Sequence, residues 1–125
     1  MAAATHNFIA EQGVTFNETL TYLAPDGVTP IDLTGMTGRM QVRDSYGAST
    51  PILDLTTANG GIILGGALGT VQILIAASVM SALTVPDTGS DHPTLFGYYD
   101  IELVNGLVVT RLVQGTFNIT REITR

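Results

Sequence analysis

The chain is 125 residues long, which is enough for one domain with a buried core of its own. Charged residues make up 13% of it, there is no lysine, and the formal net charge is −6. A phosphate backbone is bound by a basic surface, so nucleic acid is not expected as a partner. The absence of cysteine excludes disulfides and thiolate metal sites.

Two stretches bear on membranes and export. The most apolar stretch, residues 62–77, is interrupted by glycines and falls short of the ~18 residues of a membrane-spanning helix. Residues 1–7 lack the basic and then apolar pattern of a signal peptide, and we expect them to form a flexible arm. No membrane partner is therefore expected.

Apolar and polar residues alternate through most of the chain, which is the period of a β-strand. A turn is predicted at Ala24-Pro25-Asp26-Gly27, where proline presets φ and glycine accepts a positive φ. Before the C-terminal region, strands are predicted over residues 14–22, 36–43, 52–56, 62–64 and 70–75.

One short helix is predicted over residues 77–83, where Val79, Met80 and Leu83 are apolar. It is too short to be stable without packing against the rest of the fold. Residues 84–95 follow and are rich in proline and aspartate, so they are predicted to form an exposed loop.

The last thirty residues predict a β-hairpin followed by a further strand. In the first arm Gly97, Tyr99, Ile101 and Leu103 share one face. Asn105-Gly106 predicts a type I′ turn, which needs positive φ at both central residues. The second arm covers residues 108–114, and a third strand runs from Phe117 towards Arg125.

Eight or nine strands at this spacing predict an all-β fold over residues 1–125. We expect a single antiparallel β-sandwich, immunoglobulin-like or jelly-roll-like, with at most the one short helix near residues 77–83. Tyr99, after Gly97-Tyr98, is similar to the tyrosine corner of immunoglobulin-like sandwiches, although Ile101 stands where a cysteine is usual.

Candidate acidic sites are concentrated in the predicted loop. Asp87-Thr88-Gly89-Ser90 matches the catalytic loop of aspartic proteases, which pair two aspartates across a dimer. Val85-Pro86 precede it where a strand in an apolar frame is needed, so a plain loop is preferred. Asp87, Asp91 and Asp100 supply oxygens that suit calcium, but their spacing is not that of an EF-hand, and solvated loop residues are preferred here too.

The remaining candidates give no reaction centre. His6 and His92 are far apart in sequence, and no motif places either as a base or a metal ligand. There is no Gly-x-Ser-x-Gly elbow, and the glycines between residues 60 and 69 do not form a phosphate-binding loop. We therefore expect no catalytic residue, no metal, no cofactor and no small-molecule substrate.

Three arginines, Arg39, Arg43 and Arg111, lie on predicted strands and could converge on one patch in the folded chain. Two interpretations of such a patch stand side by side. The arginines bind a carboxylate of a neighbouring subunit, or they pair with acidic groups within their own sheet.

The chain resembles a group of small structural proteins of tailed bacteriophages. The resemblance starts at Glu11-Gln12-Gly13-Val14-Thr15-Phe16 and continues through residues 31–43, with Leu33-Thr34-Gly35 followed by Arg39-Met40-Gln41-Val42-Arg43. It ends with Tyr99-Asp100-Ile101-Glu102-Leu103, residues 109–112 and Ile123-Thr124-Arg125. The arrangement is also similar to the N-terminal β-sandwich module of phage baseplate upper proteins.

The resemblance implies a non-enzymatic virion protein, assembled in the host cytoplasm, that docks on tail, baseplate, neck or capsid subunits and on copies of itself. Capsid decoration is the competing role within that interpretation. The segment from Phe117 to Arg125 is the expected intersubunit contact, to be tested by deleting residues 122–125. An alternative of another class is a free-standing carbohydrate- or ligand-binding β-sandwich module.

Overall fold

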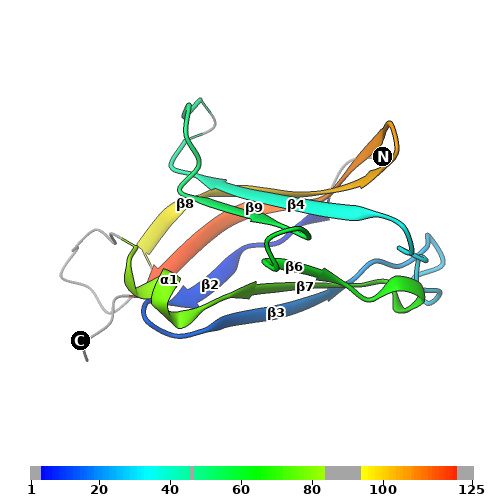
Figure 1. The fold of residues 1–125 in the computed structure, drawn as a ribbon, viewed down its shortest axis with the longest axis horizontal. Helices are drawn as coiled ribbons and strands as arrows, with labels where there is room; N and C mark the ends of the chain where they lie inside the picture. Colours follow the sequence, from blue (N-terminus) through cyan, green and yellow to red (C-terminus); the bar gives the residue numbers. More distant parts are fainter. Residues whose placement is uncertain (1–3, 46, 84–93, 121–125) are drawn as a thin grey trace.

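The computed structural model describes residues 4–45, 47–83 and 94–120, which form two β-sheets packed face to face. In Figure 1 the sheet that contains β4 and β8 lies above the sheet that contains β3 and β7. The described residues form nine strands, one 3-10 turn and one short helix. The predicted all-β sandwich of eight or nine strands is confirmed.

The larger sheet is built around a long hairpin. Its arms are β8 (Thr94–Asn105) and β9 (Val108–Thr120), which pair antiparallel along almost their whole length. β4 (Thr37–Arg43) pairs with the other side of β8, and β5 (Leu53–Thr56) pairs with β4 at the edge. The residues that alternate in the sequence therefore alternate between core and solvent.

The smaller sheet has the order β3-β7-β6. Its strands are β3 (Phe16–Thr21), β7 (Thr70–Ile75) and β6 (Ile62–Leu64). A 3-10 turn, η1 (Gly66–Leu68), joins β6 to β7, and α1 (Ala77–Ser81) follows β7. The helix begins at the predicted residue but ends at Ser81, before the predicted residue 83, and Met80 is its one buried residue.

Two strands near the N-terminus were not predicted. β1 (Ala4–Thr5) and β2 (Phe8–Glu11) run parallel to β9 in one continuous register, from Ala4 opposite Val113 to Glu11 opposite Thr120. The sandwich is therefore mixed, not purely antiparallel. The described part of the expected N-terminal arm, residues 4–7, lies in this sheet, where the Asn7 side chain accepts a hydrogen bond from the Thr116 N–H.

The core lies between the two sheets and is apolar, with no buried polar or charged residue among those described. Phe8 is central to one end of it, because its ring contacts the rings of Phe16, Tyr99 and Phe117. Burial of a large side chain contributes about 1.5–3 kcal/mol. Phe8 thus explains why β2 stays docked on β9.

The hairpin turn differs from the predicted one by one residue. Asn105 pairs with Val108, so the two-residue loop is Gly106-Leu107. Gly106 has φ of 61°, and among the described residues no other residue type has a positive φ. A positive φ at the first central residue alone is the pattern of a type II′ turn, in which glycine takes that position. The predicted type I′ turn is therefore wrong.

The final strand also differs from its prediction. Phe117 and Ile119 belong to β9 itself, are buried in the core, and lie between β8 and β2. This part of β9 is not a free edge that a neighbouring subunit can occupy. Residues 121–125, the rest of the expected contact, lie outside the described residues, as do residues 84–93 of the predicted loop.

Candidate binding face

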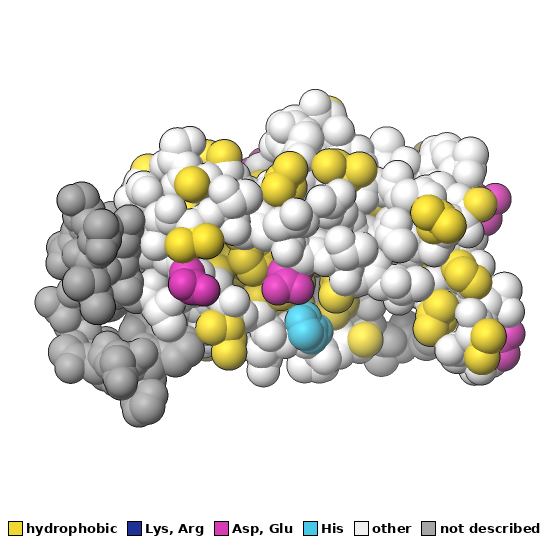
Figure 2. All heavy atoms as spheres, turned by 90° about the horizontal axis from the view of Figure 1, so that it is seen from below, with side chains coloured by type: hydrophobic (Ala, Val, Ile, Leu, Met, Phe, Trp, Pro, Cys, Tyr) yellow, Lys and Arg dark blue, Asp and Glu magenta, His cyan; other side chains and the backbone are white. Residues whose placement is uncertain are grey.

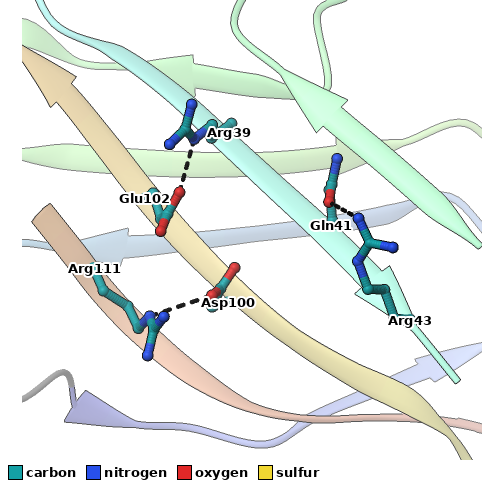
Figure 3. Close-up of polar contacts among 6 residues, drawn as sticks. All are labelled: Arg39, Gln41, Arg43, Asp100, Glu102 and Arg111. Carbon is teal, nitrogen blue, oxygen red and sulfur yellow. Dashed lines mark hydrogen bonds and ion pairs between the residues drawn. The ribbon is translucent and has the colours of Figure 1, made fainter. Parts of the chain in front are cut away.

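Polar side chains of three adjacent strands share the outer surface of the larger sheet. Figure 3 shows arginines from β4 and β9 pointing towards carboxylates on β8. We call this surface the charged face; its members are Arg39, Gln41, Arg43, Asp100, Glu102, Arg111 and Gln114. The predicted convergence of Arg39, Arg43 and Arg111 is therefore correct.

Arg111 reaches this face because β9 has an irregularity. The register with β8 shifts between Ile101, which pairs with Val113, and Glu102, which pairs with Arg111, so that Leu112 is an extra residue. Strict alternation would turn Arg111 to the same side as the buried Val113. The extra residue instead turns Arg111 outward beside Glu102, as β-bulges commonly do.

Two ion pairs connect the strands of the charged face. The Arg39 Nε lies 2.7 Å from the Glu102 Oε1, and the Arg111 Nε lies 3.2 Å from the Asp100 Oδ2. Both arginine side chains are 53% exposed, and exposed pairs of this kind contribute only about 0–1 kcal/mol to stability. These pairs hold the side chains in place more than they hold the fold together.

Arg43 is held at the other end of the face without a carboxylate. Its guanidinium donates to the Gln41 Oε1 and to the Ala48 carbonyl oxygen, both at 2.7 Å. Both of these hydrogen-bond acceptors are neutral, and the guanidinium acts on the Asp100 carboxylate only through space. Pairing within the sheet is confirmed for Arg39 and Arg111, whereas Arg43 forms no ion pair with a described carboxylate.

A hollow of about 360 Å³ lies between these side chains. Gln41, Arg43, Tyr98, Asp100 and Arg111 are among its lining residues. Partial burial raises the pKa of the Asp100 carboxyl, and the nearby Glu102 raises it further, while the arginines act in the opposite direction. Keeping the Asp100 carboxyl ionised in the folded protein therefore costs free energy.

Charge is distributed unevenly over the molecule. All three described arginines lie on the charged face, whereas most described carboxylates lie outside β4, β8 and β9: Glu11, Glu18, Asp26, Asp32, Asp44 and Asp54. Figure 2 shows the molecule from the β3 side, where acidic side chains are visible and no lysine or arginine is. Asp54 on β5 lies opposite Gln41 on the same outer surface, so three arginines and three carboxylates balance there in a chain of −6.

The other predicted site residues do not assemble. Of the expected calcium ligands only Asp100 is described, and it pairs with Arg111; Asp87, Asp91 and the whole Asp-Thr-Gly-Ser segment lie outside the described residues, as does His92. His6 is exposed and packs edge-on against Phe8. Within residues 4–45, 47–83 and 94–120 no cluster of potential metal ligands occurs.

Tyr99 does not form a tyrosine corner. Its hydroxyl donates to the His6 carbonyl oxygen, in the segment between β1 and β2, and not to a residue a few positions upstream. Burial raises the pKa of the Tyr99 hydroxyl. The residue fastens the N-terminal strand to the sheet, a role that the sequence pattern did not indicate.

No protein-family model matches this sequence, and no curated protein matches it. Among solved structures, the extracellular domain of the voltage-gated sodium channel β4 subunit is similar over 98% of this chain and 97% of its own, with 12% identity and a TM-score of 0.51. The immunoglobulin-like domain of mouse leukocyte-associated immunoglobulin-like receptor 1 matches over 90% and 86%, with 14% identity and a TM-score of 0.43.

The fold is an immunoglobulin-like sandwich. The sheet order β9-β8-β4-β5 opposite β3-β7-β6 corresponds to strands G-F-C-C′ opposite B-E-D of a variable-type domain. β2 occupies the edge beside G. This assignment places the charged face on the G-F-C sheet.

The prediction of a virion structural protein of a tailed bacteriophage is wrong. The extracellular domain of the sodium channel β4 subunit, which is similar over almost the whole chain, is not a phage protein, and this finding favours the alternative of a free-standing binding module. The sequence resemblance to phage structural proteins, and the location derived from it, stay predictions.

No helix among the described residues has the length and apolar character that crossing a membrane requires.

Proposed function

We propose that the chain is a non-catalytic binding module that associates with a second copy of itself through the charged face. The observation that carries the proposal is the collection of all described arginines on one sheet surface, interleaved with Asp100 and Glu102. Mixed charges on one flat surface favour protein contact, because they can be matched by a complementary pattern on another protein.

A two-fold contact suits such a face. In an isologous dimer each residue of one copy meets a residue of the other in both directions, so a surface with both signs can complement itself. Arg43, which forms no ion pair with a described carboxylate of its own chain, is placed to meet Asp100 or Glu102 of the second copy. The contact is polar and open to solvent, so it is expected to be weak and sensitive to salt.

The similarity to the channel domain supports this proposal without deciding it. That domain forms parallel homodimers, which are connected with its role in cell–cell adhesion. At 12% identity the likeness carries the fold, and the face proposed for this chain rests on its own arginines and carboxylates.

The test is sedimentation equilibrium of the purified chain and of Arg43→Glu over a range of concentrations at low and high ionic strength. The wild-type chain should form dimers that weaken as salt is added, and Arg43→Glu should weaken dimerisation by about tenfold or more, since it sets like charges against each other. A chain that is monomeric throughout, or a variant that dimerises like the wild type, would overturn the proposal.

The control carries the same change of net charge on another surface. Thr19→Glu with Thr21→Glu lowers the net charge by two on the exposed side of β3, as Arg43→Glu does on the charged face. It should leave the dimer unchanged. Circular dichroism of each variant verifies that the sandwich is folded.

A further inference from the structure

Three dipeptides of the chain place a glycine directly after an aspartate or an asparagine: Asp26-Gly27, Asn59-Gly60 and Asn105-Gly106. In such a dipeptide the glycine nitrogen can attack the side-chain carbonyl carbon of the residue before it, because glycine has no side chain to hinder the approach. All three glycines have a positive φ, between 61° and 82°, and the residue before each of them is exposed. Exposure and glycine geometry therefore do not distinguish the three dipeptides, whereas their hydrogen bonds do.

Asp26 is held by hydrogen bonds within its own turn. Its carboxylate accepts from the Thr29 hydroxyl and from the N–H groups of Thr29 and Val28, at 2.6–2.9 Å. These hydrogen bonds, that of the Thr29 hydroxyl first, lower the pKa of the Asp26 carboxyl to about 2. The Gly27 N–H donates to the Ala24 carbonyl oxygen. The side chain is thus an ionised carboxylate, a poor target for a nucleophile, and the nitrogen that would attack it is engaged.

Asn59 is held as firmly in the turn between β5 and β6. Its Oδ1 accepts from the N–H groups of Thr56 and Gly61, and its Nδ2 donates to the Asp54 carbonyl oxygen, each at 2.9 Å. All three partners are backbone groups, so these contacts are made wherever the turn is folded. The Asn59 amide has to leave its partners before its carbon can approach the Gly60 nitrogen.

Asn105 lacks such contacts. Its side chain forms no hydrogen bond with any other described residue. It is the last residue of β8 and pairs with Val108 across the turn of a hairpin that extends beyond the body of the sandwich (Figure 1). The end of a hairpin opens more readily than its centre, because few contacts hold it. Leu107 in this turn is 102% exposed and adds no packing, so one strand pair is all that has to open.

We propose that Asn105 is a site of spontaneous deamidation. The Gly106 nitrogen forms a bond to the Asn105 Cγ, and the bond from Cγ to Nδ2 breaks. The amide group leaves as ammonia and takes up the proton that the Gly106 nitrogen loses, and a five-membered succinimide ring remains. Water then opens the ring at one of its two C–N bonds, which yields an aspartate or an isoaspartate. The sum consumes one water and releases one ammonia, with no oxidation or reduction.

The two products change the hairpin in different ways. Each replaces a neutral amide by a carboxylate, so the net charge of the chain changes from −6 to −7. Isoaspartate also carries the main chain through its Cβ and Cγ, which adds one methylene group to the backbone. The added atom disturbs the pairing with Val108 next to a turn that depends on the positive φ of Gly106. We expect the isoaspartate form to lose this last strand pair and the aspartate form to keep it.

The test is incubation of the folded chain at mildly alkaline pH, followed by cleavage after glutamate and mass spectrometry of the peptides. Because Glu102 lies between them, Asn59 and Asn105 fall in different peptides. Asn105 should convert from amide to acid at least about ten times faster than Asn59, because three hydrogen bonds must first break at Asn59. Fragmentation of the second peptide assigns the change to Asn105 and not to Asn118.

The control is the same incubation in urea that unfolds the chain, continued until Asn59 has reacted there. Without the fold the two Asn-Gly dipeptides should react at similar rates, and this sets the time over which the folded chain is followed. Equal rates at both sites in the folded chain would overturn the proposal. So would a folded chain in which Asn105 stays intact over that time.

A variant checks the site by a second measurement. Asn105→Gln keeps an amide at this position, but its reaction needs a six-membered ring, which forms more slowly. Ion-exchange chromatography of the incubated wild-type chain should show an acidic species that grows with time and elutes like Asn105→Asp. The species should be nearly absent from incubated Asn105→Gln. An acidic species that forms in this variant as fast as in the wild type would place the reaction elsewhere and contradict the proposal.

Discussion

Gly115 on β9 leaves room for the N-terminal strand. A Cβ built at this position would overlap the His6 carbonyl oxygen and the Asn7 side chain. Gly115→Ala should therefore push β1 and β2 away from β9 and destabilise the fold by about 1–3 kcal/mol, the usual cost of forcing atoms into a packed site. Urea unfolding measures the loss.

The matched control for this substitution is Gly47→Ala, in an exposed loop where an added Cβ meets nothing within 4 Å. It should change stability by only a few tenths of a kcal/mol. If Gly115→Ala is as stable as Gly47→Ala, the close approach of the His6 carbonyl does not constrain the chain.

Asp100 predicts a pH dependence of a definite sign. Burial and Glu102 raise the pKa of this carboxyl above its ordinary value, so the folded state holds the proton to a higher pH than the unfolded state does. Between the two pKa values stability should fall as the pH rises. In urea unfolding measured from about pH 3 to pH 7, Asp100→Asn should no longer show this decrease in the free energy of unfolding. Asp54→Asn, which replaces an exposed carboxylate, should still show it.

At the scale of the elements, the bulge at Leu112 decides what the outer face of β9 carries. Deleting Leu112 would remove the extra residue and leave Arg111 opposite Glu102, in regular alternation with the buried Val113. Arg111 should therefore stay on the charged face, and the deletion variant should unfold at about the same urea concentration as Leu112→Ala, which keeps the bulge and loses only the leucine side chain. A deletion variant that is clearly less stable than Leu112→Ala would show that the bulge itself is needed.

Most strands could be predicted because alternation alone determines them. Met40 and Val42 are buried while Arg39 and Arg43 lie outside, as their order in the sequence indicates. The convergence of the arginines followed from the same pattern. Alternation does not indicate which strands pair with each other, because pairing depends on contacts between residues far apart in the chain.

The features that the sequence did not predict also depend on pairing between distant residues. β2 is only four residues long and pairs with a strand about a hundred residues away, so nothing local marks it. The bulge at Leu112 and the turn at Gly106-Leu107 each shift the register by one residue, which the apolar pattern of neighbouring valines tolerates equally well. The functional class was wrong because short motifs on strands do not separate one β-sandwich family from another.

For the whole molecule, the proposed two-fold contact implies an association that stops at the dimer, because an isologous contact closes on itself. The scattering mass should therefore level off at twice the mass of one chain as the concentration rises. Arg43→Glu should stay close to the mass of one chain over the same concentrations in small-angle X-ray scattering. Growth of the wild-type chain beyond the dimer would point to a second contact surface.

The parallel pairing of β2 with β9 has a mechanical consequence. Because the two strands run in the same direction, the chain enters the sandwich near Ala4 at one end and leaves β9 at Thr120 at the other. A force that pulls these two points apart loads the hydrogen bonds between the strands in shear. They must then break together and not one after another, so the fold is suited to bear tension along its length.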